Sequence, residues 1–594
     1  MLRKIFYLLL TALKKCYNIR KYELRCICIT NERRLYSIQN KLPLPIGASN
    51  YKLVSTEYYY VDKTLLIKEL LDERAIITLF TRPRRFGKTL NMDMLRTFFE
   101  KTPEDTSKYF KDKKIWQAGE KYTSQQGKYP IIFLSLKDVK FSNWEIALEL
   151  LKEVIRNEYA RHPELEKSTE LTKADTNLYQ KIVNDTASDA NYLFSLGALS
   201  RMLHAHHKLA PIIIIDEYDT PIQEGYINSY YKQVVEFIRI LFSSALKDNP
   251  HVTLAVLTGI LRIAKESIFS GLNNIRIYSV LDTQFSNYFG FTAEEVQTMA
   301  DYYHAVDKLS EIQQWYDGYK FGNTEIYNPW SVLYYFGNNC TALPYWVQTS
   351  GNAVIHEILQ NLNTDTCESL RELLNGITLD SIINTNIIYP NLKDMESNIF
   401  SFLLMTGYLK SVNTTIDDQG TYICQLAIPN KEVQSVYCNE ILSLLSNHIG
   451  ENIVHTLNQA LVTKNTASLK IALKTFLMES ISYYDGLKEN YYHGLLLGMS
   501  IIFSSDYYLL SNRESGDGRY DIQLQPKTAA MPSIIIEIKA AKDATEEMLK
   551  ALAANALAQI DSKKYDTELC KQSIKTIYKY GIAFSGKKAE IATN

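Results

Sequence analysis

The chain has 594 residues, of which 46% are hydrophobic and 22% are charged, so it is long enough for several domains with apolar cores. Its 65 Lys+Arg and 66 Asp+Glu residues nearly cancel, which excludes a global basic field and leaves only a local patch for any nucleic-acid contact. The eight cysteines form no CxxC pair, which argues against a zinc ribbon or a disulfide framework and favours reduced thiols in a cytoplasm.

Residues 1–43 read as an extension before the first globular domain. Met1–Lys4 is basic and Ile5–Leu13 is apolar, but Lys14 and Lys15 follow without a small-residue cleavage site. The apolar run is too short to span a bilayer, and no other stretch approaches a membrane span. We therefore expect neither a secretion signal nor a membrane anchor, and we interpret this segment as a disordered arm or a misassigned start.

Residues 44–272 show the alternation of strands and helices that is typical of a doubly wound α/β domain. Ala75–Phe80 is a short apolar run typical of a buried parallel strand, and Leu90–Glu100 reads as a helix. Strand, loop and helix in this order are the context that a phosphate-binding loop requires. The further expected strands are Tyr129–Leu134, Pro211–Ile215 and Val252–Thr258.

The loop between that strand and helix ends in Gly87, Lys88 and Thr89, as in the pattern GxxxxGK[ST]. Arg82 stands where the pattern has its first glycine, and Arg85 adds positive charge. Gly87 permits close approach of the backbone, Lys88 would reach the β- and γ-phosphates of ATP, and Thr89 would hold Mg²⁺. The alternative is a basic surface loop.

The second half of this nucleotide site follows the strand of four isoleucines. Asp216 and Glu217 would lie at the carboxyl edge of the sheet, where ligands bind in such domains. Asp216 would hold Mg²⁺ through water and Glu217 would polarise the attacking water, whereas the alternative is a solvated strand end. The next strand ends at Thr258, which would sense the γ-phosphate. Arg262 would stabilise its charge, although solvation of a helix face explains Arg262 equally well.

Residues 273–448 differ in character, because aromatic residues, asparagine and short amphipathic patterns replace clear strands. We expect a mostly helical middle domain, followed by a helical connector over 449–479. The aromatic residues are candidates for stacking on nucleic-acid bases, but at this density core packing is the more common role.

Residues 480–594 read as a second α/β module with a candidate metal site. Glu537 and Lys539 are two residues apart on an apolar strand, so their side chains share one face. Asp521 lies near the start of the neighbouring strand-like run, Tyr520–Gln525. Such a carboxylate pair can hold Mg²⁺ or Mn²⁺, and Lys539 would position or activate the bound water.

Other residues near this site are weaker candidates. Glu489 and His493 are four residues apart and share a helix face, so Glu489 is a candidate for an additional metal ligand. His493 fits a structural histidine better. By itself the D…ExK pattern is weak, because a salt-bridged acid and lysine on one strand are common.

Several segments together resemble one family. They are YYYVDKT, RPRRFGKT, IIIIDEYDTPI, LTGILRIAKESIFSGLNN, FGFT, WYDGYKFG, YNPWSVL, YWVQTSGN, YYHGLLLGM, ESGDGRYDIQL and IIIEIKA. These segments are similar to the bacterial AAA-ATPase-like family, whose members join this NTPase domain to a C-terminal PD-(D/E)XK nuclease-like domain. The resemblance implies that an arginine-rich loop is usual, so Arg82 does not count against it. It also implies that Gln559 and Tyr565 lie near the active site, as in some PD-(D/E)XK nucleases.

The sequence thus predicts an α/β protein with an N-terminal doubly wound P-loop NTPase domain, a helical middle region and a C-terminal PD-(D/E)XK-like domain. The expected function is ATP binding and hydrolysis joined to a metal-dependent nuclease that acts on DNA in a bacterial cytoplasm. The alternative is a nucleotide-gated switch or scaffold whose C-terminal domain binds nucleic acid or protein without cleaving it. The sequence is also compatible with a homo-oligomer, because many P-loop ATPases receive an arginine from a neighbouring subunit.

Overall fold

The computed structural model describes most of the chain from residue 41 onward. The described residues are 41–262, 274–346, 364–374, 376–392, 394–437, 451–480, 496, 506–511, 514–515, 518–528, 531–567, 569 and 576–594. Within those ranges no helix has the length and the apolar character that a membrane span needs.

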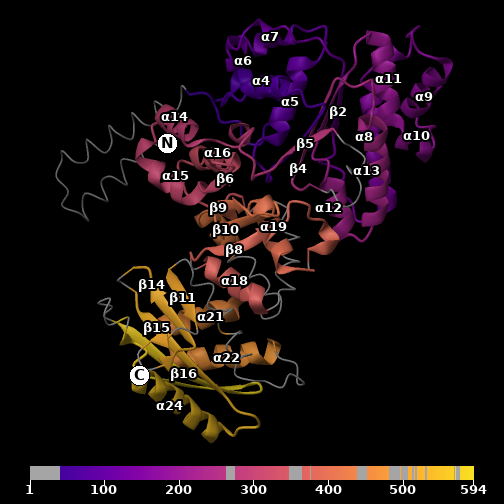
Figure 1. The fold of residues 1–594 in the computed structure, drawn as a ribbon. Helices are drawn as coiled ribbons and strands as arrows, with labels where there is room; N and C mark the ends of the chain where they lie inside the picture. Colours follow the sequence, from indigo (N-terminus) through magenta and orange to yellow (C-terminus); the bar gives the residue numbers. More distant parts are fainter. Residues whose placement is uncertain are drawn as a thin grey trace, which may run out of the picture.

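A parallel five-stranded sheet forms the centre of the N-terminal part, with strand order β2-β3-β4-β1-β5. Helices lie on both sides of this sheet (Figure 1), which confirms the doubly wound fold. The sheet extends past the expected boundary at residue 272, because β5 pairs with β1. The strands are β1 (Ile77–Thr81), β2 (Ile131–Ser135), β3 (Ile212–Asp216), β4 (Leu254–Gly259) and β5 (Ile275–Tyr278).

The helices of this part pack their apolar faces on a sheet whose central strands are buried on both sides. All five residues of β3 are buried, as expected for a strand covered by helices on two faces. The helices are α3 (Tyr51–Glu57), α4 (Leu65–Glu73), α5 (Lys88–Phe99), α6 (Lys114–Gln117), α7 (Glu120–Thr123), α8 (Trp144–Ala160), α9 (Lys173–Val183), α10 (Asp189–Leu193), α11 (Ser195–His207), α12 (Thr220–Ile227) and α13 (Tyr231–Leu246).

The strand order fixes where a ligand can bind. The chain passes from β1 to the edge strand β2, returns through β3 and β4 to the side of β1, and then adds β5 on the other side. The order therefore reverses at β1, and a crevice opens at the carboxyl ends of the strands around such a point. The loop after β1 and the last residues of β3 and β4 all lie at this edge.

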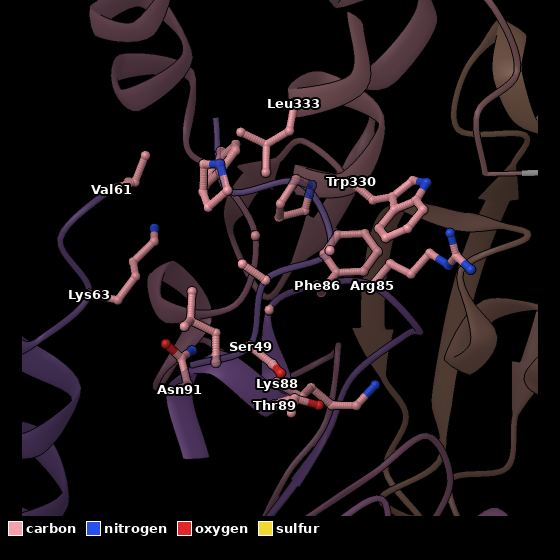
Figure 2. A pocket seen from close by; sticks show the side chains of 18 of the residues that line it. Ser49, Val61, Lys63, Arg85, Phe86, Lys88, Thr89, Asn91, Trp330 and Leu333 are labelled. Carbon is pink, nitrogen blue, oxygen red and sulfur yellow. The ribbon is translucent and has the colours of Figure 1, made fainter. Parts of the chain in front are cut away.

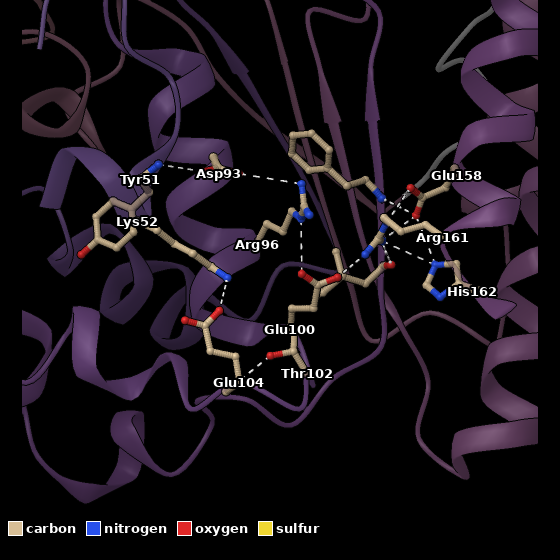
Figure 3. Close-up of polar contacts among 12 residues, drawn as sticks. Tyr51, Lys52, Asp93, Arg96, Glu100, Thr102, Glu104, Glu158, Arg161 and His162 are labelled. Atoms are coloured by element: carbon tan, nitrogen blue, oxygen red, sulfur yellow. Dashed lines mark hydrogen bonds and ion pairs between the residues drawn. The ribbon is translucent and has the colours of Figure 1, made fainter. Parts of the chain in front are cut away.

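Side chains at the end of α8 and directly after it cover the open side of β2 (Figure 3). Glu158 accepts the backbone N–H of Phe133 at 2.9 Å, and Arg161 donates to the carbonyl of Ile131. Arg161 also pairs with Glu158 at 2.7 Å and with Glu100. This network satisfies backbone groups that an edge strand otherwise leaves open to another chain, and it fixes β2 beside β3.

The middle region is built from helices, as expected, and also contains two small sheets. The helices are α14 (Ala293–Tyr303), α15 (Leu309–Tyr316), α16 (Pro329–Gly337), α18 (Thr364–Leu374) and α19 (Glu396–Thr406). A hairpin joins β6 (Tyr319–Phe321) and β7 (Thr324–Ile326), and an antiparallel sheet has the order β8-β10-β9. The strands of that sheet are β8 (Leu379–Ile383), β9 (Lys410–Ile416) and β10 (Tyr422–Ala427).

The C-terminal part is a mixed sheet with the order β11-β14-β15-β16-β17, antiparallel except for the parallel pair β15 and β16. Helix α24 (Glu546–Ser562) connects that parallel pair, and a short hairpin joins β12 (Glu514–Ser515) and β13 (Gly518–Arg519). The strands of the sheet are β11 (Tyr507–Ser511), β14 (Ile522–Pro526), β15 (Ser533–Ala540), β16 (Ile577–Ser585) and β17 (Lys588–Thr593).

Two apolar cores show how these parts group. One core runs from the N-terminal sheet into the middle region, where it includes Tyr319 and Leu426. Another joins the C-terminal sheet to α21 (Glu451–Val462) and α22 (Thr466–Ser480). The helices that we expected as a connector therefore pack as part of the C-terminal unit.

Candidate functional site

The first site begins at the carboxyl end of β1. The backbone N–H of Arg82 donates to the carbonyl of Gly259 at 3.0 Å, which ties the loop to the end of β4. Gly87 then caps α5 with a φ of 79°, a left-handed conformation that glycine adopts without strain. The first turn of α5 has backbone N–H groups without helical partners, and the partial positive charge of a helix N-terminus favours an anion there. This is the geometry of a phosphate cradle.

Lys88 lies inside this loop. Its side chain is buried, and Nζ donates to the carbonyls of Arg82 at 2.9 Å and Pro83 at 2.8 Å. Burial lowers the pKa of Lys88, and the nearby carboxylates, Glu217 first among them, act against this effect. The ammonium is thus held beside the helix N-terminus, where phosphate oxygens would replace the two carbonyls as its partners.

Thr89, Asp216 and Thr258 form a hydrogen-bonded chain across three neighbouring elements. The hydroxyl of Thr89 donates to Asp216 Oδ2 at 2.8 Å, and the hydroxyl of Thr258 donates to Asp216 Oδ1 at 2.7 Å. Burial raises the pKa of Asp216, which is fully buried. The structure therefore brings together three residues that the sequence placed at separate strand and helix ends. Their hydroxyl and carboxylate oxygens are the ligand type that Mg²⁺ takes, so the residues present fit this ion.

The two acids after Asp216 have different surroundings. Glu217 adopts a left-handed backbone conformation with a φ of 52°, and its side chain lines the cavity described below. Its Oε2 accepts from the hydroxyl of Thr220 at 3.3 Å. Asp219 is buried and accepts the backbone N–H groups of Ile260 at 2.7 Å and Leu261 at 3.0 Å. Asp219 therefore holds the loop after β4, whereas Glu217 faces the space where a ligand would bind.

Arg82 does not point toward the cradle. Its side chain is fully buried and donates through Nη1 to the carbonyls of Thr81 at 2.9 Å and Tyr278 at 2.7 Å. The guanidinium lies 5.3 Å from the ring centre of Phe289 and 5.1 Å from that of Phe321. Burial lowers the pKa of Arg82 to about 9. Arg82, which replaces the first glycine of the pattern, therefore holds the loop through buried hydrogen bonds.

Arg84 and Arg85 also contact protein groups. The guanidinium of Arg85 lies 3.9 Å from the ring centre of Trp330, and burial lowers its pKa to about 10. Arg84 donates to the side-chain oxygen of Gln223 at 2.8 Å. Arg262 is half-buried at the end of a described range, and its Nε has no hydrogen-bond partner there. The phosphate roles expected for Arg85 and Arg262 stay predictions.

A cavity of about 330 Å³ opens from the cradle (Figure 2). Its walls come from the loop, from the segment before β1 and from the middle region. Lys88 and Thr89 lie at one end, and Val61 and Leu333 lie at the opposite end. This size is in the range of small-molecule sites, and the arrangement offers a polar end for phosphates and an apolar end for a base.

The second site lies on β15. Glu537 is buried there, and its Oε1 accepts from Lys539 Nζ at 3.1 Å and from Gln559. Gln559 also donates to the hydroxyl of Tyr565 at 3.0 Å. Asp521, at the start of the neighbouring strand, accepts the backbone N–H of Ile538 at 2.7 Å. The structure thus gathers the predicted Asp521, Glu537 and Lys539 with the two residues that the resemblance implied.

The electrostatics of Glu537 suit a metal ligand. Burial, together with the charge of Asp521, raises its pKa to about 7. Its second oxygen, Oε2, is buried without a hydrogen-bond partner among the described residues. A buried carboxylate oxygen without a partner is unfavourable, and a bound cation would satisfy it, so the residues present fit a divalent ion.

Among the described residues, no third carboxylate ligand accompanies Asp521 and Glu537. Among the described residues no three histidine, cysteine or acidic side chains converge on one point. The candidates Glu489 and His493 lie outside the described residues, and the role of Glu489 stays a prediction.

Comparison with known proteins agrees with the two domains that the sequence predicted. Residues 45–269 match the model of the family described as predicted AAA-ATPase, and residues 487–594 match that of the PD-(D/E)XK nuclease superfamily. This chain joins an AAA-ATPase-like domain to a PD-(D/E)XK nuclease-like domain. It is also 26% identical over 412 residues to a protein of Azotobacter chroococcum mcd 1 named "Uncharacterized protein in vnfD 5'region", with 68% of this chain and 70% of that protein covered.

Sequence reasoning missed part of the site in the AAA-ATPase-like domain. The segment before β1 and the middle-region residues Phe291 and Leu333 line the cavity, as does Lys137 after β2. Several of these residues stand in the segments YYYVDKT, FGFT and YNPWSVL that carry the family resemblance. Those segments did not indicate a role in the cavity, because that role depends on packing between distant segments. The sequence did offer one indication for Lys137. It closely follows the predicted strand Tyr129–Leu134, and the carboxyl ends of the strands in such sheets form the edge where ligands bind.

Proposed function

We propose that this protein binds ATP with Mg²⁺ and hydrolyses ATP in its AAA-ATPase-like domain. The observation that carries the proposal is the chain Thr89–Asp216–Thr258 beside the buried Lys88. This constellation lies at the N-terminus of α5 and opens into a cavity that Glu217 also lines. A phosphate cradle, hard oxygen ligands and a carboxylate facing the cavity are what phosphoryl transfer to water requires.

The residues divide the work as follows. Lys88 and the first turn of α5 hold the β- and γ-phosphates, while Thr89 and Asp216 would hold Mg²⁺. Bound Mg²⁺ would neutralise charge on the phosphates. Glu217 orients a water and takes one of its protons as the water oxygen bonds to the γ-phosphorus. The bond from that phosphorus to the bridging oxygen breaks, and its electron pair leaves with ADP.

We extend the proposal to metal-dependent cleavage of DNA by the nuclease-like domain. Asp521 and Glu537 would hold Mg²⁺ or Mn²⁺, supported by the unpartnered Glu537 Oε2, and Lys539 would position the attacking water. The bound ion would lower the pKa of that water and stabilise charge on the phosphate. A cytoplasmic setting in a bacterium fits the scattered cysteines, which form no CxxC motif, and the relative from Azotobacter chroococcum.

A nucleotide-gated switch is the second candidate, and one observation favours it. The middle region holds the phosphate loop. The ring centres of Phe86 and Tyr319 are 4.9 Å apart, and the guanidinium of Arg85 lies over the ring of Trp330. A change in the loop on nucleotide binding would therefore reach the middle region directly. As a switch, the protein would change conformation when it binds ATP, and its C-terminal domain would bind nucleic acid or protein without cleaving it.

The test combines ATP turnover with cleavage of supercoiled plasmid in Mg²⁺ or Mn²⁺, with and without ATP. The proteins are wild type, Lys88→Ala, Glu217→Gln and Glu537→Ala, with the exposed Lys111→Ala and Glu547→Ala as matched controls. We expect Lys88→Ala and Glu217→Gln to lose ATP turnover by at least about 100-fold, a size typical of losing one such group. Glu537→Ala should lose cleavage and keep turnover, and both controls should behave as wild type.

The outcomes separate the two candidate functions. Cleavage that persists in Glu537→Ala would contradict the nuclease site. ATP binding without turnover or cleavage in the wild type would favour the switch.

A further inference from the structure

The cavity beside the phosphate loop has cationic side chains in its wall, and most of them have protein partners. Lys63 pairs with Glu295 at 2.6 Å, Arg85 lies over Trp330, and Lys88 donates to carbonyls of its own loop. Lys137 is exposed and makes no ion pair or hydrogen bond within the described part of the chain. Lys137 is therefore an exposed cation of this wall that is available to an anionic ligand.

The pairing of β2 with β3 places Lys137 at the acidic end of the site. Ser135 lies opposite Asp216 in the parallel register, and the backbone N–H of Leu136 donates to the carbonyl of Asp216 at 3.0 Å. The chain after β2 thus continues alongside the end of β3. Lys137 emerges at the same edge as Glu217, and both side chains line the cavity.

Ser135 gives a second, independent sign that the end of β2 belongs to the site. Paired residues of neighbouring parallel strands face the same side of a sheet, so Ser135 faces the side of Asp216. Its hydroxyl is buried, and no described residue hydrogen-bonds to it. A buried hydroxyl without a partner is costly, which favours a ligand or water oxygen beside it.

We propose that Lys137 is a catalytic residue of ATP hydrolysis, whose ammonium contacts the γ-phosphoryl group opposite Lys88. The proposal rests on the ATPase function proposed above. As water adds to the γ-phosphorus and gives a proton to Glu217, the bond to the bridging oxygen breaks and its electron pair leaves with ADP. Negative charge on the phosphoryl oxygens and the leaving oxygen shifts during this step, and a cation in cis stabilises it. Lys137 keeps its protons throughout.

The experiment uses the full-length protein and compares wild type, Lys137→Ala, Lys137→Arg and Lys140→Ala. Lys140 is an exposed lysine three residues further on that does not line the cavity, so it is a matched control. The readouts are kcat for ATP and the Kd values of ATP and ADP measured separately. ADP lacks the γ-phosphoryl group, so a merely structural role would affect both nucleotides alike.

We expect Lys137→Ala to lower kcat on the order of 100-fold and to weaken ATP binding several-fold while ADP binding is unchanged. Lys137→Arg should recover most of the activity, and Lys140→Ala should match wild type. If Lys137→Ala keeps the wild-type kcat and the wild-type ratio of the Kd values for ATP and ADP, this inference is overturned and the proposed function stands. Absence of ATP turnover in the wild type would instead overturn the proposed function, and this inference with it.

Discussion

Glu432 is a buried carboxyl group of the middle region with a direct consequence for stability. Ser331 Oγ lies 2.9 and 2.8 Å from its two oxygens, and the backbone N–H of Trp346 donates to it at 2.8 Å. Burial raises the pKa of Glu432 to about 8, while these bonds and the charge of Arg85 act in the opposite direction. The group is therefore protonated in the folded protein near neutral pH, whereas in the unfolded chain it ionises near its ordinary value of 4.5.

This difference predicts a pH-dependent stability. Because the folded state keeps a proton that the unfolded state releases, the contribution of Glu432 is complete below pH 4.5 and is lost as the pH rises toward 8. As the pH rises, we expect this group to lower the free energy of unfolding by about 1.4 kcal/mol per pH unit at most. Glu432→Gln should lack this dependence of the unfolding free energy on pH. Urea unfolding followed by tryptophan fluorescence, at a series of pH values between about 5.5 and about 7.5, measures both slopes.

The matched control is Glu325→Gln, an exposed glutamate of the same region, which should keep the wild-type slope. If Glu432→Gln runs parallel to wild type as well, Glu432 does not hold a proton in the folded state.

At the residue scale, the sequence revealed those side chains whose position follows from a strand or helix end. Lys88, Thr89 and Asp216 come together because the ends of parallel strands meet at one edge of a sheet. Arg82 and Glu432 could not be placed in the same way. Their roles come from burial against distant segments, and neither residue stands in a local pattern that reports burial.

At the element scale, the contact between α24 and β16 supports the nuclease-like site. Gly581 on β16 lies opposite Glu537 in the parallel register. A Cβ at Gly581 would lie 2.5 Å from the backbone nitrogen of Leu557 and would also clash with the carbonyl of Ala553, both on α24. The same helix carries Gln559, which donates to Glu537. The close approach of helix and sheet therefore positions Glu537, the carboxylate that we propose as a metal ligand.

We expect Gly581→Ala to push α24 away from the sheet, to destabilise the domain by about 1–3 kcal/mol, and to weaken stabilisation by Mn²⁺. Gly586→Ala is the control, because Gly586 has a φ of 55° and its Cβ would meet no atom within 4 Å. It should cost about 1 kcal/mol through backbone strain and leave the Mn²⁺ effect intact. Thermal unfolding with and without Mn²⁺ measures both effects. Equal Mn²⁺ effects in the two variants would contradict a role for this contact in the site.

The sequence predicted elements best where they are apolar and central. The four expected strands β1 to β4 are all present, within a few residues of the expected bounds, because continuous apolar runs are typical of buried parallel strands. The sheet β8-β10-β9 was missed. Strand β9 exposes most of its residues and is rich in threonine and asparagine, so its sequence looks like a loop until it pairs with β10. Pairing between distant segments supplies what the local pattern lacks.

At the scale of the whole molecule, the C-terminal unit is larger than its sequence match. The match to the PD-(D/E)XK superfamily begins at residue 487, whereas α21 and α22 share the apolar core of this sheet. The hydroxyl of Tyr580 on β16 donates to the carbonyl of Leu461 at 2.8 Å, and Lys470 pairs with Glu590 on β17 at 2.6 Å. The two helices therefore cover a face of the sheet that would otherwise expose apolar side chains.

This arrangement predicts which C-terminal fragment folds. We expect residues 449–594 to give a soluble fragment that unfolds in one cooperative transition, and residues 480–594 to aggregate. The helices bury side chains such as Leu461, Leu473 and Phe476, and each is worth roughly 1.5–3 kcal/mol. Their combined loss approaches the total stability of a domain, about 5–15 kcal/mol. Circular dichroism and sedimentation of the two fragments measure the difference.

A pair of substitutions within fragment 449–594 makes the same test independent of chain length. Leu473 is fully buried on α22, whereas Ile471, two residues earlier on the same helix, is 68% exposed. Leu473→Ser should lower the unfolding midpoint strongly, because it removes apolar contact with the sheet and buries a hydroxyl. Ile471→Ser should leave the midpoint nearly unchanged, since this side chain already faces solvent. Equal midpoints for the two variants, or cooperative unfolding of fragment 480–594, would show that the sheet folds without its two helices.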